Sequence, residues 1–475
     1  MGKTTGFLEY TRKEPEYRPV QERLNDYKDV LGPLSEDELT QQAARCMDCG
    51  VPFCHGLGCP LHNIIPEWND LVYKGEWGQA LHLLEKTNSL PEITSRVCPA
   101  TCEAACTLSI NDSPVTIKQI ELAIIEYGFK NKLVKPIIPN KKIAKKIAVI
   151  GSGPAGLAAA ISLCRFGYNV TVFEKASKLG GILRYGIPDF KLEKWVIDRR
   201  LELMKKSGIK FQTDVSIGED ISYRYLKKSF DVTLLTVGAD EPRDLKTPGR
   251  ELQGIHFAMD YLTQSNKFVA GDIDKKDIIW AQDKNVLVIG GGDTGSDCVG
   301  TANRQHAKKI YQFEIMPKPQ EWKETWNPNW PDWPIILRES SSHKEGVQRE
   351  WSILVKKFTG KNNKLNEVHC SRLEWKKSKE NGSVKMFEIP KSDFVIKADL
   401  VFLAMGFIHL KHNKLIQDIG LKLDQKGNIK TDRNYATNIK NVFAAGDAGT
   451  GASLVVHAIN QGQEAAKSIN NFLEF

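Results

Sequence analysis

The chain has 475 residues, of which 41% are hydrophobic and 26% are charged, and its formal net charge is +8. This length predicts two or three domains, and the absence of any apolar run near the ~18 residues that cross a bilayer excludes a membrane-spanning class. The amino terminus lacks the apolar segment of a secretion signal, and no nucleic-acid-binding motif accompanies the positive charge. We therefore expect a cytoplasmic protein that binds neither membranes nor nucleic acid.

The first 140 residues predict helices rather than strands. Helical periodicity covers 35–47, 76–86 and 116–129. Ser35 followed by Glu38 is typical of a capping box, in which each residue satisfies a backbone N–H of the other at a helix start.

Seven of the ten cysteines lie between residues 46 and 106. They are arranged as Cys46-x2-Cys49-x4-Cys54-x4-Cys59 and as Cys98-x3-Cys102-x3-Cys106. The short spacings bring Cys46, Cys49 and Cys54 near one point, as a [4Fe–4S] cluster requires. A Cys-Pro pair such as Cys59-Pro60 typically serves a second cluster.

The last three cysteines also favour two clusters. If Pro99 begins a helix, Cys98, Cys102 and Cys106 follow one helical face and span about 12 Å, which is too far for one cluster to share. Seven thiols leave one of eight ligands missing, and Glu121 falls on the apolar face of the helix predicted over 116–129, where a carboxylate needs a partner. Glu121 is therefore a candidate ligand, and an ordinary ion-paired glutamate is the alternative.

Residues 130–146 are basic and contain two prolines, which predicts a linker. Beyond it, buried-strand patterns alternate with helical segments, which indicates parallel sheets covered by helices. The predicted strands include 147–150, 169–173, 231–237, 285–289 and 399–404.

A glycine-rich loop follows the first of these strands. In Gly151-Ser-Gly153-Pro-Ala-Gly156, the first glycine permits a tight turn, the second lets a pyrophosphate approach the backbone, and the third lets the helix pack on the strand. Glu174 lies eighteen residues after Gly156, at the end of a strand, where an acid binds ribose hydroxyls.

Two further segments favour FAD in this unit. A glycine-containing segment, 179–188, follows closely, and a Gly-Asp pair follows a short strand near the carboxyl terminus. The candidate FAD-binding residues are Gly151, Gly153, Pro154, Ala155, Gly156, Glu174, Lys175, Gly181, Arg184, Gly446 and Asp447.

A second loop repeats the pattern after strand 285–289. Its candidate nicotinamide-nucleotide residues are Gly290, Gly292, Asp293, Thr294, Gly295 and Glu314. The carboxylate of Glu314 would accept hydrogen bonds from ribose hydroxyls and repel a 2′-phosphate, which favours NADH over NADPH. The following stretch, 318–334, holds four tryptophans and predicts a packed surface loop, with contact to a partner as the functional alternative.

The order of these motifs indicates nested domains. We predict a helical [4Fe–4S] domain over 1–140, an FAD-binding domain over 145–270 and 395–475, and an NAD(P)H-binding domain over 271–394. The fold class is α/β: a helical iron–sulfur domain followed by two Rossmann-like domains of the glutathione-reductase type.

The motifs together resemble the small (beta) subunit family of glutamate synthase and the related amino-terminal half of dihydropyrimidine dehydrogenase. The segments that carry this resemblance include CMDCGVPFCHGLGCP, VCPATCEAACTL, VIGSGPAGLAAA, KLGGILRYGIPDFKLEK and VLVIGGGDTGSDC. The resemblance implies FAD, two [4Fe–4S] clusters and a nicotinamide nucleotide, and the FEIMPKP segment is similar to NADH-using members.

The resemblance also assigns the cluster ligands. It implies one cluster on Cys46, Cys49, Cys54 and Cys106, and another on Cys59, Cys98, Cys102 and Glu121. The implied activity passes electrons from NAD(P)H through FAD and the clusters to a large (alpha) subunit that makes L-glutamate from L-glutamine and 2-oxoglutarate. No catalytic side chain is assigned.

Two alternatives remain at this point. One is an NAD(P)H oxidoreductase with another acceptor, namely ferredoxin, a sulfur species or a pyrimidine-reducing partner. The other is a zinc-stabilised nucleotide-binding scaffold, although the cysteine spacings lack the paired CxxC motifs of a zinc ribbon.

Overall fold

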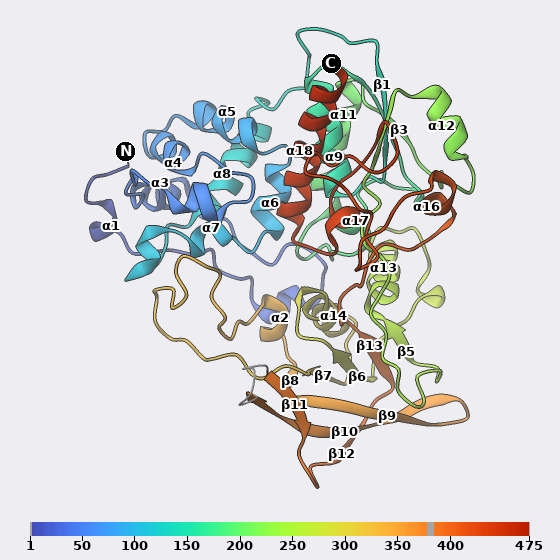
Figure 1. Cartoon of the computed structure of the whole chain (residues 1–475). Coiled ribbons are helices and arrows are strands. Elements are labelled where there is room, and N and C mark those ends of the chain that lie inside the picture. Colours follow the sequence, from blue (N-terminus) through green and yellow to red (C-terminus); the bar gives the residue numbers. More distant parts are fainter. Residues whose placement is uncertain (1, 378–383, 475) are drawn as a thin grey trace.

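The computed structural model describes residues 2–377 and 384–474. Figure 1 shows a helical amino-terminal part beside two α/β units, one above the other, with a small antiparallel sheet against the lower unit.

The amino-terminal part is helical, and its capping box is confirmed. The hydroxyl of Ser35 accepts from the N–H of Glu38, and the Glu38 carboxylate accepts from the N–H of Ser35. The elements are α1 (Gly6–Glu9), α2 (Val20–Arg23), α3 (Glu36–Ala44), the π-helix η1 (Cys54–Gly58), α4 (Ile65–Tyr73), α5 (Trp77–Thr87), α6 (Pro91–Val97), α7 (Thr101–Ala104), the 3₁₀-helix η2 (Thr107–Ile110) and α8 (Ile117–Lys130).

The first α/β unit contains a five-stranded parallel sheet. Its strand order is β14 (Val442–Ala444), β4 (Val232–Leu235), β1 (Lys146–Ile150), β2 (Asn169–Phe173) and β3 (Lys210–Gln212). Helices α9 (Pro154–Arg165) and α18 (Val455–Glu474) pack closely because Gly462 faces Ala155, where an added Cβ would lie 2.2 Å from the Ala155 carbonyl oxygen.

The second unit contains another five-stranded parallel sheet. Its order is β5 (Ile255–Phe257), β13 (Leu400–Leu403), β6 (Asn285–Ile289), β7 (Lys309–Glu314) and β8 (Gln348–Trp351). Helices α13 (Ala258–Val269) and α14 (Asp293–Arg304) bury one face of this sheet. The small sheet of β9 (Ile353–Lys361), β10 (Lys364–Lys377), β11 (Val384–Glu388) and β12 (Phe394–Lys397) covers the other face.

In chain order, all the strands of the second parallel sheet lie between β4 and β14 of the first sheet. β5 and β13 lie in ranges predicted for the FAD-binding domain, yet Ile255 of β5 pairs with Val401 of β13 in the second sheet. Short apolar strands look alike in sequence, and only pairing assigns them to a sheet.

Shorter elements complete the described chain. They are α10 (Ile182–Tyr185), α11 (Lys194–Lys206), α12 (Tyr223–Ser229), η3 (Lys275–Asp277), α15 (Ser341–Lys344), α16 (Lys414–Ile419) and α17 (Asp447–Thr450). In the described part of the chain, none of the helices combines the length and apolarity needed to cross a membrane.

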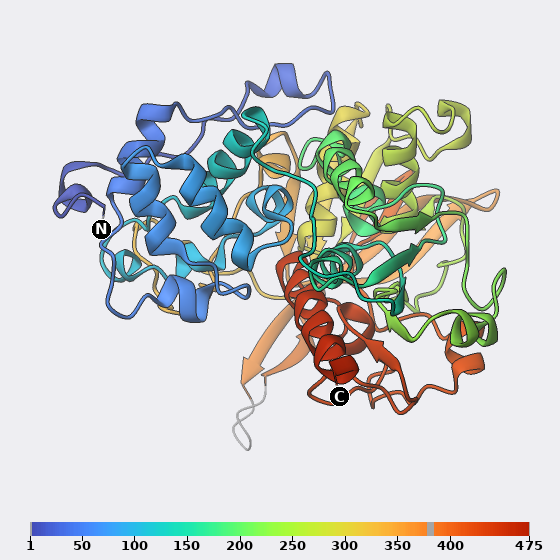
Figure 2. The same cartoon turned by 90° about the horizontal axis from the view of Figure 1, so that it is seen from above.

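Polar contacts join the helical part to both units. Figure 2 shows it lying alongside them, with the carboxyl-terminal helix α18 on the first unit. Gln463 of α18 accepts from the N–H of Ser89 at 2.9 Å, and the buried Arg200 of α11 binds the buried Glu92 of α6 at 2.6 Å. These contacts fix the cysteine-bearing helices against the first unit.

Candidate functional site

Two cavities inside the helical part are lined by the seven clustered cysteines. The cavity called site A here is lined by Cys46, Cys49, Cys54 and Cys106, and site B is lined by Cys59, Cys98, Cys102 and Glu121. All seven thiols are free, and five of them are buried. The structure thus gathers all eight candidate ligands into the two sets that the family resemblance implies.

Site A is built from three short chain segments. Cys46 lies two residues beyond α3, Cys54 begins η1, and Cys106 follows α7. Burial raises the pKa of the Cys46 thiol to about 11 and also raises the pKa of Cys54 and Cys106, with the neighbouring thiols adding to the effect. A positively charged group between these sulfurs would remove that penalty on the thiolates.

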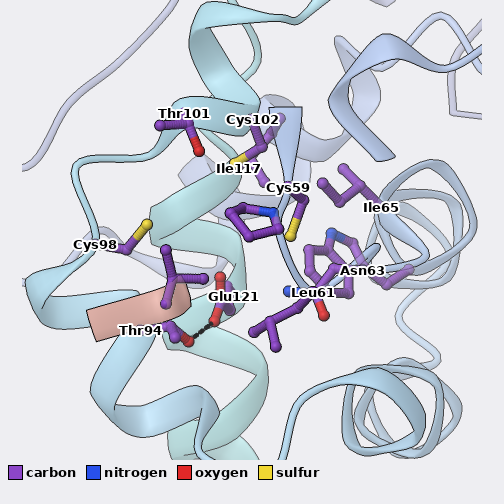
Figure 3. Close-up of a pocket in the computed structure, with 13 residues that line it drawn as sticks. Cys59, Leu61, Asn63, Ile65, Thr94, Cys98, Thr101, Cys102, Ile117 and Glu121 are labelled. Carbon is purple, nitrogen blue, oxygen red and sulfur yellow. Dashed lines mark hydrogen bonds between the residues drawn. The ribbon is translucent and has the colours of Figure 1, made fainter. Parts of the chain in front are cut away.

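Site B lies between η1, α6, α7 and α8. In Figure 3 the sulfur atoms of Cys59, Cys98 and Cys102 and the carboxylate of Glu121 surround the same space. Burial raises the pKa of Cys59 to about 12 and that of Cys102 well above its ordinary value.

The prediction of one helix that begins at Pro99 and carries Cys98, Cys102 and Cys106 on one face is wrong. Helix α6 ends at Val97, and α7 spans Thr101–Ala104. Ala100 between them has φ of +67°, in the left-handed region, so the chain turns there instead of continuing. Helix α7 ends at Ala104, so Cys102 lies within it and lines site B, whereas Cys106 lies two residues beyond its end and lines site A.

Glu121 is buried and held in one orientation. One carboxylate oxygen accepts from the hydroxyl of Thr94 and from the side-chain amide of Asn88 at 3.2 Å. Burial raises the pKa of the carboxyl to about 7. Sequence reasoning missed Asn88 and Thr94, since neither carries a motif and both lie at least 27 residues from Glu121.

The two cavities are neighbours. The side chains of Ile65 and Ile117 line both of them, so a shared apolar wall separates the two sets of ligands. Val456, in the first turn of α18, also lines site B. Site B therefore borders the first α/β unit directly.

The first glycine loop has the geometry that a pyrophosphate requires. Gly151 has φ of +100°, and a Cβ on Gly156 would lie 2.0 Å from the Gly151 carbonyl oxygen, whereas the space beside Gly153 is open. The Glu174 carboxylate accepts from the Ser152 N–H at 3.1 Å, at the loop.

Other candidate residues surround this loop. Gly181, with φ of +52°, faces the backbone of Gly153. Asp447 accepts from the Ser453 hydroxyl at 2.8 Å, and burial raises its pKa to about 6. Arg184 pairs with Asp198, and the exposed Lys175 pairs with Asp240.

The second loop repeats the first. Gly290 has φ of +122°, Gly295 faces the Gly290 carbonyl, and the space beside Gly292 is open. The Glu314 carboxylate accepts from the N–H of Gly291 at 2.5 Å, as Glu174 does from Ser152. Asp293 and Thr294 form the first residues of α14, so the helix amino terminus faces the loop.

The tryptophan-rich stretch packs against site A. The indole N–H of Trp330 donates to the Cys106 carbonyl oxygen at 3.1 Å, and its ring lies 4.8 Å from the ring of Phe53. Asn327 bonds Ala104 and Ser109. The prediction of a packed loop is confirmed, although its sequence did not show what it packs on.

Comparison with known proteins gives two family matches. Residues 145–462 match the pyridine nucleotide-disulphide oxidoreductase family, and residues 23–133 match the family described as dihydropyrimidine dehydrogenase domain II, 4Fe-4S cluster. These matches and the parallel sheets confirm the predicted fold class.

Individual curated relatives cover nearly the whole chain. The glutamate synthase (NADPH) small chain of Mycobacterium tuberculosis is 46% identical over 98% of this chain and 95% of its own length. The glutamate synthase (NADH) of Saccharomyces cerevisiae is 42% identical over 99% of this chain but only 22% of its own length. Among solved structures, FprA from M. tuberculosis in complex with NADPH matches the fold with a TM-score of 0.54 at 17% identity, over 70% of this chain and 86% of that one.

Proposed function

Because the chain belongs to the glutamate synthase small-chain family, we propose that it moves electrons from NAD(P)H through FAD and two [4Fe–4S] clusters to a large chain. The large chain would use them to make L-glutamate from L-glutamine and 2-oxoglutarate. When bound, the flavin accepts a hydride, and the clusters carry single electrons. The roles proposed for this chain's own residues are to bind, orient and shield those groups.

We assign the cluster ligands to the two cavities. Site A would hold a cluster on Cys46, Cys49, Cys54 and Cys106, and site B would hold one on Cys59, Cys98, Cys102 and Glu121. The donor sets fit, because free thiols are the ligands that iron–sulfur clusters require. Thr94 and Asn88 would orient the Glu121 carboxylate toward the cluster.

The zinc alternative fits the cavities less well. Within residues 2–377 and 384–474, no three Cys, His, Asp or Glu side chains converge closely enough to hold a single metal ion. The support for iron–sulfur clusters is the donor set itself, seven thiols and one carboxylate in two adjoining cavities.

The arrangement also supports an order for the electron path. Val456 lines site B from the first turn of α18, and Ala458 of the same helix faces Gly446 in the segment proposed for FAD. Site A is separated from site B by Ile65 and Ile117. Electrons would therefore leave the flavin for site B and reach site A last.

The two glycine loops support the nucleotide assignment. FAD would bind the first unit, with its pyrophosphate at Gly153 and the start of α9, and NAD(P)H would bind the second, at Gly292 and the start of α14. Glu314 stands where a ribose would lie, so we propose a preference for NADH. The relatives described above include both NADPH and NADH enzymes, so the proposed preference rests on Glu314 alone.

The observation that carries this proposal is the gathering of eight candidate ligands into two adjoining cavities. Anaerobically purified chain should contain FAD, about eight iron atoms and about eight sulfides. Cys54→Ser and Cys102→Ser should each remove one cluster and leave the other. A chain that contains zinc, or that fails to reduce a dye with NADH or NADPH, would contradict the proposal.

A further inference from the structure

We propose that the large chain docks on an apolar surface directly over site A, which rests on the function proposed above. This docking surface consists of exposed side chains on three segments, 47–58, 107–110 and 327–335. It would bring the acceptor's own redox centre beside the last cluster of the path.

The three segments are held together as one surface. The ring of Trp330 contacts Phe53, and its indole N–H binds the carbonyl of Cys106, next to η2. The N–H of Asn327 donates to the carbonyl of Ser109 in η2 at 2.6 Å. Segments far apart in sequence therefore meet around a single point.

Large apolar side chains on these segments face solvent. The exposed fractions are 73% for Val51, 59% for Leu57, 48% for Ile110, 38% for Trp333 and 79% for Ile335. Ile335 stays near Trp330 because its N–H donates to the side chain of Asn329 at 3.0 Å. Gathered exposed apolar side chains are typical of protein interfaces, where burial supplies the binding energy.

The docking surface is also the outer wall of site A. Met47, Cys49, Pro52, Thr107 and Leu108 line the cavity, and they belong to the same segments that carry Val51, Leu57 and Ile110. A protein bound here would approach site A more closely than site B, which adjoins the first α/β unit.

A yeast relative indicates which protein would occupy this surface. The yeast protein contains a region equivalent to this chain within a polypeptide of which this chain covers only 22%. This chain covers 95% and 99% of the lengths of two relatives named small chains, so a separate large chain would take the place of the additional yeast sequence. That chain needs electrons from the end of the path, and the docking surface lies at that end.

The test compares matched charge insertions. The double variant Val51→Glu with Ile335→Glu should keep its FAD, iron and NAD(P)H-driven dye reduction, because neither side chain lines site A or site B. Its affinity for the large chain should fall at least about tenfold, the size expected when central interface side chains are changed, and glutamate formation should fall with it. Ile138→Glu, in the linker, is the control, since Ile138 is 88% exposed and lies outside the three segments.

Unchanged affinity of the double variant, measured by titration of large chain, would overturn the docking surface. Equal weakening of large-chain binding by Ile138→Glu would also overturn it. So would weakened binding in Phe387→Glu, on the exposed strand β11, together with unchanged binding in the double variant. Loss of the proposed function would appear separately, as absent iron or absent dye reduction in the unaltered chain.

Discussion

Trp330 and Cys106 are joined by a hydrogen bond of 3.1 Å from the indole N–H to the backbone carbonyl oxygen. Trp330 follows β7 of the second α/β unit, whereas Cys106 lines site A in the helical part. The side chain of Trp330 therefore connects the second α/β unit to the wall of site A.

This contact predicts that Trp330 protects the cluster proposed for site A. Trp330→Ala removes both the hydrogen bond and the ring beside Phe53, so oxygen and water should reach the cavity more easily. We expect visible absorbance of the clusters to bleach in air several-fold faster than in the unaltered chain. Trp330→Phe keeps the ring and should be intermediate. Trp333→Ala is the matched control, and equal bleaching of the Trp330 and Trp333 alanine variants would contradict the role.

A second prediction concerns a buried ion triad. Arg23 of α2 lies 3.0 Å from the Glu345 carboxylate, and Arg304 of α14 lies 2.6 Å from it, with side-chain exposures of 1%, 0% and 0%. Glu345→Gln leaves two buried guanidinium groups without a counter-charge. We expect a loss of about 3–5 kcal/mol in the free energy of unfolding, measured by denaturant titration.

The triad has an exposed pair as its control. Glu202→Gln breaks the surface pair with Lys205 and should leave the unfolding midpoint unchanged. A stable Glu345→Gln variant would mean that the amino-terminal segment is anchored by its packing and not by this carboxylate.

The sequence motifs predicted those features whose residues lie close together along the chain. The glycine loops specify their own geometry, because Gly151 and Gly290 need backbone angles that other residues rarely adopt. Cys46, Cys49 and Cys54 are close in sequence and therefore had to be close in space. Glu121 was identified from helical periodicity, since it is a carboxylate on an apolar face.

Other features depend on contacts between distant residues and could not be read from the sequence. The turn at Ala100 contradicts the helical spacing of the cysteines that flank it. Trp330 reaches a partner 224 positions away. The small sheet β9–β12 was not predicted. Its apolar side chains are buried only because they pack against the second parallel sheet, a contact between distant residues that the sequence does not show.

Acid sensitivity should arise at His343. Burial, together with nearby Arg349 and Lys191, lowers its pKa from 6.5 to about 3, and its Nδ1 accepts from the Ser340 N–H. The folded-state pKa lies below the unfolded value, so this contribution to stability is present above pH 6.5 and is lost as pH falls toward 3. Over this range the free energy of unfolding should change by at most about 1.4 kcal/mol per pH unit because of His343.

His343→Asn should flatten this dependence, because an amide oxygen can accept the same hydrogen bond without titrating. The measurement is the midpoint of thermal unfolding between pH 5 and 8 for both chains. His82→Asn, which removes an exposed imidazole, is the control. Parallel curves for His343→Asn and the unaltered chain would refute the assignment.

Glu121 should be required for one cluster only. Glu121→Ala removes the fourth ligand proposed for site B, so iron and sulfide should fall from about eight toward about four per chain. Glu121→Cys should restore much of the loss, because it returns an anionic ligand. Gln119→Ala, on another face of α8, should keep the full content. Full iron in Glu121→Ala would show that three thiols, or a ligand other than Glu121, complete the site.

The nucleotide preference should depend on Glu314. Its carboxylate accepts from the N–H of Gly291 at 2.5 Å, so a negative charge lies at the proposed ribose position. Glu314→Gln keeps an acceptor for that N–H but removes the repulsion of a 2′-phosphate, so the KM for NADPH should fall about tenfold while kcat with NADH changes little. Glu321→Gln, which breaks an exposed pair with Lys318, is the control. If the ratio of kcat/KM for NADH to that for NADPH is the same in both variants and in the unaltered chain, selectivity is set elsewhere.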